Sequence, residues 1–317
     1  MKMFEIRRYT EADKAEWDAF VAQSKNGTFL FFRDYMDYHA DRFSDHSLMV
    51  YDADGRLYAL LPANDDGQGA LRSHQGLTYG GLVMSRGCKA AQVRDLFVLL
   101  NDYLRGQGFR RVVYKHVPWV YDRLPAEEDL FAIANVCHAQ LYARDIASVV
   151  MLGRRLPFST LRRRGVKKGL QAGLCVRELS DLAVFWQMLE QHLEQKFQAR
   201  PVHSLDEIML LKERFPDNIR LMTVCKDGVI VGGTLLYDCG QTVKTQYIVA
   251  SEEGRQLGAL DFLFGHLLDR YEAEGRQFFD FGTSNKVEND DLNEPLIFQK
   301  EGFGARAVCY DTYEWNV

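Results

Sequence analysis

The segment from Arg255 to Ala259 is suited to holding an anion. It reads Arg255-Gln256-Leu257-Gly258-Ala259 and opens a predicted helix that continues to about residue 274. Glycine lets a backbone approach a bound group closely, and the free amides and dipole of a helix start favour negative charge. The sequence therefore predicts a phosphate or pyrophosphate site here. The alternative is a plain helix start without a ligand.

A run of positive charge lies between residues 146 and 177, where no acidic residue occurs. Its cations are Arg154, Arg155, Arg162, Arg163, Arg164, Lys167, Lys168 and Arg177. A helix predicted over 159–172 places Arg163 and Lys167 on one face, where a pyrophosphate or an RNA backbone would relieve their repulsion. The same helix carries the glycines Gly165, Gly169 and Gly173, which destabilise it unless another element packs close. The alternative is a solvated basic face.

Polar and aromatic residues gather at or after the ends of predicted strands in the first half of the chain. They are His74, Tyr79, Lys115, His116, Trp119 and Tyr121. Such side chains bind a sugar by stacking and hydrogen bonding. We take His74, Tyr79, Lys115 and His116, with Arg163 and Lys167, as candidate substrate-binding residues. Ordinary packing is the alternative for each of them.

Composition and missing motifs exclude several classes of protein. The chain has 317 residues and a net charge of −5, which argues against a general nucleic-acid binder. The six cysteines are scattered, and neither they nor the histidines have metal-ligand spacing, so no metal is expected. Nucleophile-elbow, Walker and zincin motifs are absent. The charged start and the lack of a long apolar stretch predict a cytoplasmic protein without membrane insertion.

Hydrophobic periodicity and turn signals predict alternating helices and strands. In the first half, helices are expected over 11–23 and 34–42, over a stretch ending at 106–108 and from 125, with strands at 29–32, 48–61, 77–84 and 111–114. In the second half, helices are expected over 159–172, 181–195 and 205–215, up to 274 and over 294–301. Strands are expected there at 175–178, 219–225, 229–237, 242–250, 278–281 and 305–315, with a loop containing Gly254 and Gly258.

The two halves share one layout. The hairpin glycine Gly55 recurs as Gly228, 173 residues later, and the helix end Gly108 recurs as Gly275, 167 residues later. The shared order and the similar offsets indicate a duplicated α/β unit. A small ligand is then expected in the cleft between the two copies.

The order of elements in the second half resembles the GNAT acyltransferase fold. In that family, the loop after the fourth strand begins a helix that cradles the pyrophosphate of acyl-coenzyme A, with the pattern Arg/Gln-x-x-Gly-x-Gly/Ala. Residues 255–260 match this pattern except at Leu260, where Gly or Ala is usual. The resemblance implies a coenzyme site formed by Val249, Ala250, Arg255, Gln256, Leu257, Gly258 and Ala259.

Two such units, with a basic helix opening the second, resemble FemABX-type transferases and GNAT-like proteins of bacterial polysaccharide gene clusters. Residues 293–304 are similar to the FemABX signature Phe-Lys-x-x-Phe-Gly, with Gln299 inserted. The expected fold is α/β (α+β), with tandem GNAT-like units at 1–152 and 153–317, each a mixed, mostly antiparallel sheet flanked by helices. The first unit is expected to be a degenerate copy that shapes the acceptor side.

The resemblance implies an N-acyltransferase that uses acetyl-coenzyme A or another acyl-coenzyme A. Its acceptor would be a small-molecule amine, such as an amino sugar or nucleotide-sugar of polysaccharide biosynthesis. Asp280 and Glu294 are the candidate catalytic residues, because they lie at or just after the strand that follows the coenzyme helix, at the edge of the expected cleft. The alternative for Asp280 is to bind backbone amides. The tyrosine that many GNAT enzymes place in the helix at 294–301 is absent, which departs from the family. Two alternatives stay open, namely a FemABX-like transferase dependent on aminoacyl-tRNA and a non-catalytic ligand-binding protein.

Overall fold

The chain forms two compact units. The computed structural model describes residues 4–286 and 291–317. One unit comprises Met1–Asp145 and Cys309–Val317, and the other comprises Ile146–Val308. The chain therefore leaves the first unit along β9 (Gln140–Met151) and returns to it along β15 (Arg306–Asn316). The sequence predicts instead that residues 153–317, including this last strand, all belong to the second unit.

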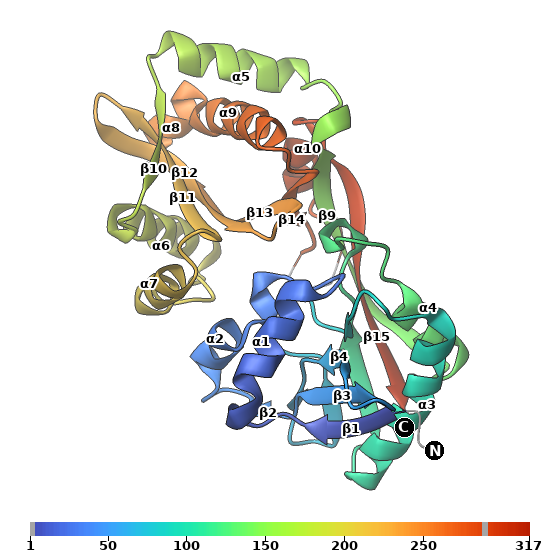
Figure 1. The fold of residues 1–317 in the computed structure, drawn as a ribbon. Coiled ribbons are helices and arrows are strands. Elements are labelled where there is room, and N and C mark those ends of the chain that lie inside the picture. The colour runs from blue at the N-terminus through green and yellow to red at the C-terminus, as the bar shows by residue number, and fades with distance from the viewer. Residues whose placement is uncertain (1–3, 287–290) are drawn as a thin grey trace. The chain divides into compact units, whose positions relative to one another are not determined.

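The second unit is layered (Figure 1). Its strands follow the order β10-β11-β12-β13-β14-β9, where β10 is Cys175–Leu179, β11 Ile219–Lys226, β12 Val229–Asp238, β13 Thr242–Ala250 and β14 Phe278–Thr283. Its helices are α5 (Thr160–Gln171), α6 (Ala183–Phe197), α7 (Leu205–Arg214), α8 (Glu252–Leu257), α9 (Ala259–Ala273) and α10 (Glu294–Glu301). Helix α9 lies along one face of the sheet with α5 outside it, and α6 lies against β12 and β13 on the other face.

Helix α9 and the strands beneath it form the core of the second unit. Leu263, Phe264 and Leu267 on the helix pack with Phe279 and Phe281 of β14 in one buried cluster. Because side chains alternate across a strand, these two phenylalanines face α9 and the residue between them, Asp280, faces the opposite side of the sheet. Strand β14, which carries the candidate catalytic residue Asp280, is thus held in place by the packing of its two phenylalanines against α9.

The first unit repeats this plan, and its strands other than β9 and β15 have five residues or fewer. It contains the sheet β1-β3-β4-β7 and the strand run β15-β8-β6-β5-β2. Its strands are β1 (Phe4–Arg8), β2 (Ser44–Asp45), β3 (Leu48–Asp52), β4 (Leu57–Leu61), β5 (Asn64–Asp65), β6 (Ala70–Arg72), β7 (Val83–Met84) and β8 (Arg111–Lys115). Its helices are α1 (Lys14–Gln23), α2 (Arg33–Met36), α3 (Ala90–Gly106) and α4 (Glu128–Asn135), with 3-10 turns η1 (Glu11–Asp13), η2 (Phe29–Phe31), η3 (Asp37–His39) and η4 (Trp119–Tyr121). The 3-10 turn η5 (Leu152–Arg154) follows β9 in the second unit.

An insertion explains why the offset between the repeats changes along the chain. In the second unit β13 pairs antiparallel with β12 and parallel with β14. In the first unit β6 makes the parallel pairing, with β8, and β7 makes the antiparallel pairing, with β4. In the first unit the loop 73–82 separates β6 from β7, whereas in the second unit the single strand β13 makes both pairings. The extra residues of the first unit therefore lie in this loop.

Three predicted elements were wrong. Residues 29–32 contain the 3-10 turn η2 instead of a strand, because an apolar run of this length does not distinguish a buried turn from a buried strand. Of the strand predicted at 77–84, only Val83–Met84 is a strand. The predicted loop before α9 is largely the short helix α8, which Ser251 caps by accepting a hydrogen bond from the Gly254 amide.

No helix in the described residues is both long enough and apolar enough to cross a membrane.

Candidate functional site

The parallel strands β13 and β14 separate within the sheet. Their ladder runs from Thr242 opposite Phe278 to Lys244 opposite Asp280 and ends there in the described residues. Strand β13 nevertheless continues to Ala250, and beyond Lys244 its edge toward β14 has main-chain groups outside the ladder. Val249 and Ala250 lie on this segment and pair only with β12 in the described ladders. An extended acyl group could hydrogen-bond such an edge as a further strand would.

Buried polar groups hold the strands at the point of separation. Asp280 is fully buried, and its Oδ1 accepts the Gly282 amide at 2.7 Å. The Lys300 ammonium on α10 donates to the carbonyls of Gly282 and Thr283 and to Ser284 Oγ at 2.7–2.9 Å, so it fixes the end of β14. Burial, with the neighbouring Lys244, lowers the pKa of Lys300 to about 8. Glu294 is instead exposed at the start of α10, where its negative charge interacts favourably with the helix dipole.

The start of α9 borders a small pocket of about 110 Å³. Its lining consists of Arg162, Arg255, Gly258, Ala259, Leu260, Asp261 and Gln299. Gly258 has a left-handed φ of 74° and offers no side chain to cap the first amides of the helix. The Arg162 guanidinium pairs with Asp261 at 2.5 Å, and Arg255 donates to the Ala250 carbonyl at 2.7 Å. The two guanidinium groups outnumber the one carboxylate, Asp261, and together with the open helix start they favour an anion.

The glycines of α5 allow that helix to pack closely on α9. A Cβ atom on Gly165 would lie 1.8 Å from Asp261 Oδ2, and one on Gly169 would lie 2.7 Å from Phe262 Cβ. A Cβ on Gly258 would lie 2.7 Å from the Gly165 carbonyl oxygen. Gly258 is therefore required for helix packing whether or not its loop binds phosphate. Leu260, which departs from the GNAT pattern, packs partly onto the core of the unit.

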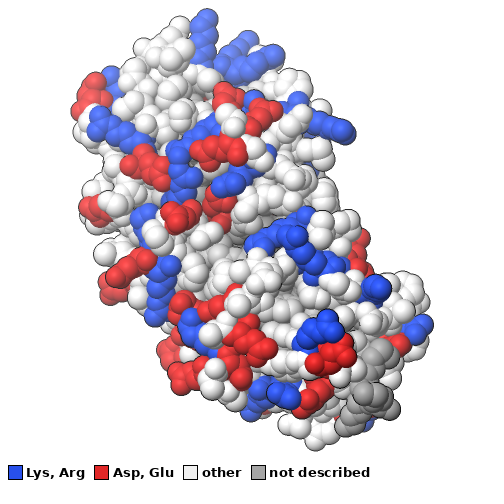
Figure 2. Space-filling view, in the orientation of Figure 1, with Lys and Arg blue, Asp and Glu red and all other residues white. Residues whose placement is uncertain are grey.

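The outer face of α5 is basic and exposed. Its cations are Arg163, Arg164, Lys167 and Lys168. Lys and Arg side chains gather where α5 lies, at the upper end of the view in Figure 2. None of these four forms an ion pair with a carboxylate in the part of the chain that the structure describes. Arg163 and Lys167 therefore lie on the solvent face of α5, whereas Arg162 reaches the pocket.

The candidate substrate residues His74, Tyr79 and His116 of the first unit are buried, and Lys115 is half-buried. Tyr79 is 1% exposed and donates to Thr28 Oγ1, and His74 stacks near His39 with a ring separation of 5.4 Å. Burial, with His39 beside it, lowers the pKa of His74 to about 3, so the ring is neutral at physiological pH. The Lys115 ammonium donates to the Leu77 carbonyl at 3.0 Å. These contacts hold the inserted loop 73–82 in place.

His116 belongs to a separate buried cluster. Its Nδ1 lies 3.3 Å from Asp129 Oδ2, which also accepts the Tyr114 hydroxyl. Burial opposes a charged ring, but Asp129 outweighs it and raises the pKa of His116. Asp122 is buried nearby.

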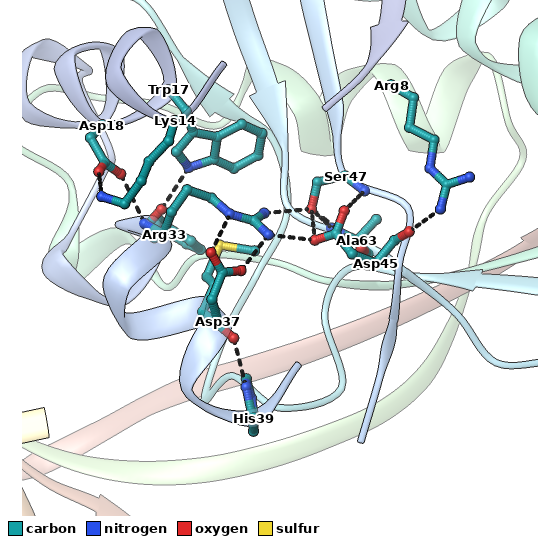
Figure 3. Close-up of polar contacts among 12 residues, drawn as sticks. Arg8, Lys14, Trp17, Asp18, Arg33, Asp37, His39, Asp45, Ser47 and Ala63 are labelled. Carbon is teal, nitrogen blue, oxygen red and sulfur yellow. Dashed lines mark hydrogen bonds and ion pairs between the residues drawn. The ribbon is translucent and has the colours of Figure 1, made fainter. Parts of the chain in front are cut away.

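Arg33 is at the centre of a polar network that sequence reasoning missed (Figure 3). The Arg33 guanidinium lies 3.9 Å from the centre of the Tyr9 ring and binds Asp37, Asp45 and Ser47. Its side chain is 4% exposed. The network ties the segment 33–37 to the segment 45–47 within the first unit. Spacing alone did not indicate it, because the acidic partners come from different elements.

Comparison with known proteins identifies the fold. Residues 159–290 match the family of acetyltransferase (GNAT) domains. The crystal structure of FemX superposes with a TM-score of 0.68 at 12% identity, covering 99% of this chain and 97% of that chain. This protein has the tandem GNAT fold. A tandem GNAT protein of the clavulanic acid biosynthesis pathway matches with a TM-score of 0.52 at 14% identity, covering 99% and 98%.

Another structural neighbour is the C-terminal domain (DUF2156) of a putative lysylphosphatidylglycerol synthetase from Agrobacterium fabrum. Its TM-score is 0.62 at 13% identity, covering 96% of this chain and 92% of that chain. A search of curated protein sequences gave no significant match. The prediction of two GNAT-like units with mixed sheets is confirmed, and so is the resemblance to FemABX and tandem GNAT proteins.

The GNAT fold brings some of the sequence candidates together. Arg255, Gly258 and Ala259 line one pocket, and Val249 and Ala250 lie on the strand that precedes it. Asp280 is the last residue of β14 in register with β13. Sequence reasoning missed Lys244 and Arg162 as members of this region. The described residues contain no group of three metal-ligating side chains.

Proposed function

We propose that the second unit transfers an acyl group from acyl-coenzyme A to an amine, with a small amino compound such as an amino sugar as acceptor. The separation of β13 from β14 beyond Lys244 and Asp280 carries this proposal. It gives the acyl arm a free strand edge, and the pocket at the start of α9 offers Arg162 and Arg255 to the pyrophosphate. Catalysis would come chiefly from holding the thioester carbonyl against a strand amide and the amine in line.

The first unit does not offer an equivalent donor site. Its parallel strands β6 and β8 also part, after Arg72 and Val113. The Ser73 hydroxyl accepts the Lys115 amide at 2.7 Å, and the inserted loop 73–82 follows. A Cβ on Gly80 would lie 1.7 Å from the Ser73 carbonyl, so the loop packs tightly against the strand end. We infer one donor site per chain, with the first unit serving the acceptor.

Titration with acetyl-coenzyme A tests the donor site. We expect micromolar binding at a stoichiometry of one, lost in Arg255→Glu because this change reverses a charge that lines the pocket. Arg177→Glu on β10 is the matched control, since Arg177 is exposed and outside the pocket. Gly258 is unsuited to this test because any side chain there would meet α5. Absence of binding by the unmodified protein would overturn the proposal.

A second candidate function is transfer of an aminoacyl group from tRNA. The exposed cations of α5 favour it, and FemX is among the structural neighbours. RNA binding would weaken steeply with added salt, whereas a single pyrophosphate contact would weaken less. Filter binding of a bulk tRNA mixture at 50 and 200 mM salt, with Lys167→Glu and Lys168→Glu, separates the two. Tight, salt-sensitive binding that both variants abolish would favour the tRNA donor.

A further inference from the structure

A hydrogen-bonded tyrosine and histidine lie beside the separated strands. Tyr247 is on β13, three positions beyond the last residue paired with β14. Its hydroxyl lies 2.7 Å from Nδ1 of His203, which precedes α7 in the connection from α6. The Tyr247 ring packs edge-on against Trp186 of α6, with centroids 5.2 Å apart. The pair therefore lies on the face of the sheet opposite α9.

A β-bulge sets the position of Tyr247. Leu235 of β12 is opposite Tyr247 and Leu236 is opposite Thr245, so Gln246 is an extra residue in the ladder. The Gln246 Oε1 atom accepts a hydrogen bond from the Lys244 ammonium at 2.8 Å. Bulges re-aim side chains, often next to active sites. Here the bulge lies between the point of strand separation and Tyr247.

The hydrogen bonds fix the direction of the phenolic proton. The main-chain N–H of His203 donates to the Tyr247 oxygen at 3.3 Å, so one of the two acceptor positions of this oxygen is filled and the other is left for the acceptor amine. The hydroxyl hydrogen is then best directed at Nδ1, which leaves the imidazole proton on Nε2. Burial raises the pKa of Tyr247, while the hydrogen bond from the His203 main chain opposes the rise. The Tyr247 phenol is thus neutral, and its hydrogen is directed at Nδ1 of His203, which can accept the proton.

We propose that Tyr247 takes the proton of the acceptor amine and passes its own phenolic proton to Nδ1 of His203, an inference that rests on the proposed acyl transfer. The amine nitrogen bonds to the acyl carbon as its proton moves to the Tyr247 oxygen and the phenolic proton moves to Nδ1. The bond from the acyl carbon to the leaving sulfur or oxygen breaks, and the leaving group departs with the electron pair. The imidazolium then returns its proton to that group through Tyr247 or water. Tyr247 is the catalytic residue and His203 acts through it.

The charged neighbours of the pair agree with this direction of transfer. The negative charge of Glu207 on α7 raises the pKa of Tyr247. The Glu207 carboxylate also accepts a hydrogen bond from the amide of Ser204, the residue after His203. A carboxylate that binds the amide next to His203 favours the imidazolium that the step forms. Lys244 on β13 is held by Gln246. Asparagine at position 203 could accept the phenolic hydrogen bond but could not take the proton.

The test compares His203→Asn with Tyr247→Phe. With acetyl-coenzyme A as donor and glucosamine as acceptor, we expect kcat to fall about 10- to 100-fold in both variants, with unchanged affinity for acetyl-coenzyme A. The double variant should lose no more than either single one, because the two groups act as a unit. His192→Asn on α6 is the control and should keep the rate. Wild-type kcat in His203→Asn would reduce the pair to a structural contact and overturn the inference.

A measurement that needs no turnover tests the same geometry. Nitrogen-15 NMR of the full chain labelled at histidine should show His203 with unprotonated Nδ1 and a proton on Nε2 at neutral pH. A proton on Nδ1 would overturn the inference, since Tyr247 could not then donate there. Failure of acetyl-coenzyme A to bind the unmodified protein would overturn the proposed function instead. The two failures are therefore distinguishable.

Discussion

Asp122 is a buried carboxyl group whose protonation is coupled to folding. The residue is 8% exposed, and burial raises its pKa to about 8 even though the nearby His116 opposes the rise. The folded protein therefore holds a proton that the unfolded chain releases near pH 4. Because the folded state binds more protons in this window, stability falls as the pH rises from about 4 to 8.

Replacing Asp122 with Asn should remove this dependence. We expect Asp122→Asn to match the parent protein near pH 4 and to exceed its free energy of unfolding by about 1–3 kcal/mol at pH 8. Urea unfolding at a series of pH values measures the difference. Asp217→Asn, at an exposed position, is the control, and its free energy of unfolding should change with pH in parallel with that of the parent protein. Parallel curves for Asp122→Asn would contradict the buried, protonated carboxyl.

The packing of α5 on α9 depends on small residues at the element scale. In Gly165→Ala the new methyl group would meet Asp261, the partner of Arg162, so the helices must move apart. We expect a loss of about 1–3 kcal/mol in the free energy of unfolding, although alanine is the better helix former.

Gly106→Ala at the end of α3 is the matched control for this prediction. Nothing lies within 4 Å of a Cβ atom there, so the change should be neutral or stabilise the protein by up to about 1 kcal/mol. Thermal unfolding of both variants provides the comparison. A Gly165→Ala protein as stable as the parent would show that the two helices tolerate a wider spacing.

Elements were easier to predict than the contacts between them. The hairpins around Gly55 and Gly228 and the helix α9 follow from local turn signals and periodicity, and all were predicted. The bulge at Gln246 and the pair of His203 with Tyr247 depend on register between strands and on residues 44 apart in sequence. Local patterns carry no information on such register. For the same reason His74 and Tyr79 suggested a binding surface, although both are buried.

At the scale of the whole molecule, the last strand completes the first unit. Thr312 to Asn316 pair with β8, and Trp315 lies in the core cluster of that unit at 4% exposure. We expect Trp315→Ala to cost about 3–5 kcal/mol through the cavity it leaves. Hydrogen exchange should show faster exchange in β8, while β12 of the second unit keeps its protection.

The exposed Trp119 supplies the control for the Trp315 prediction. It is 47% exposed, and Trp119→Ala should change the free energy of unfolding by less than about 0.5 kcal/mol. Equal loss of protection in β8 and β12 of Trp315→Ala would show instead that both units unfold as one cooperative block.

The return of β15 to the first unit also affects the order of events on the ribosome. Residues 146–308 are continuous, so the second unit can become complete as soon as this stretch has emerged. The first unit, although synthesised earlier, still lacks Cys309–Val317 at that moment, so β8 does not yet have its partner strand β15. The usual order of domain folding during translation, from the N-terminus onward, is therefore reversed for the last step. A nascent chain stalled short of residue 309 would leave one edge of β8 and the site of Trp315 open to chaperones.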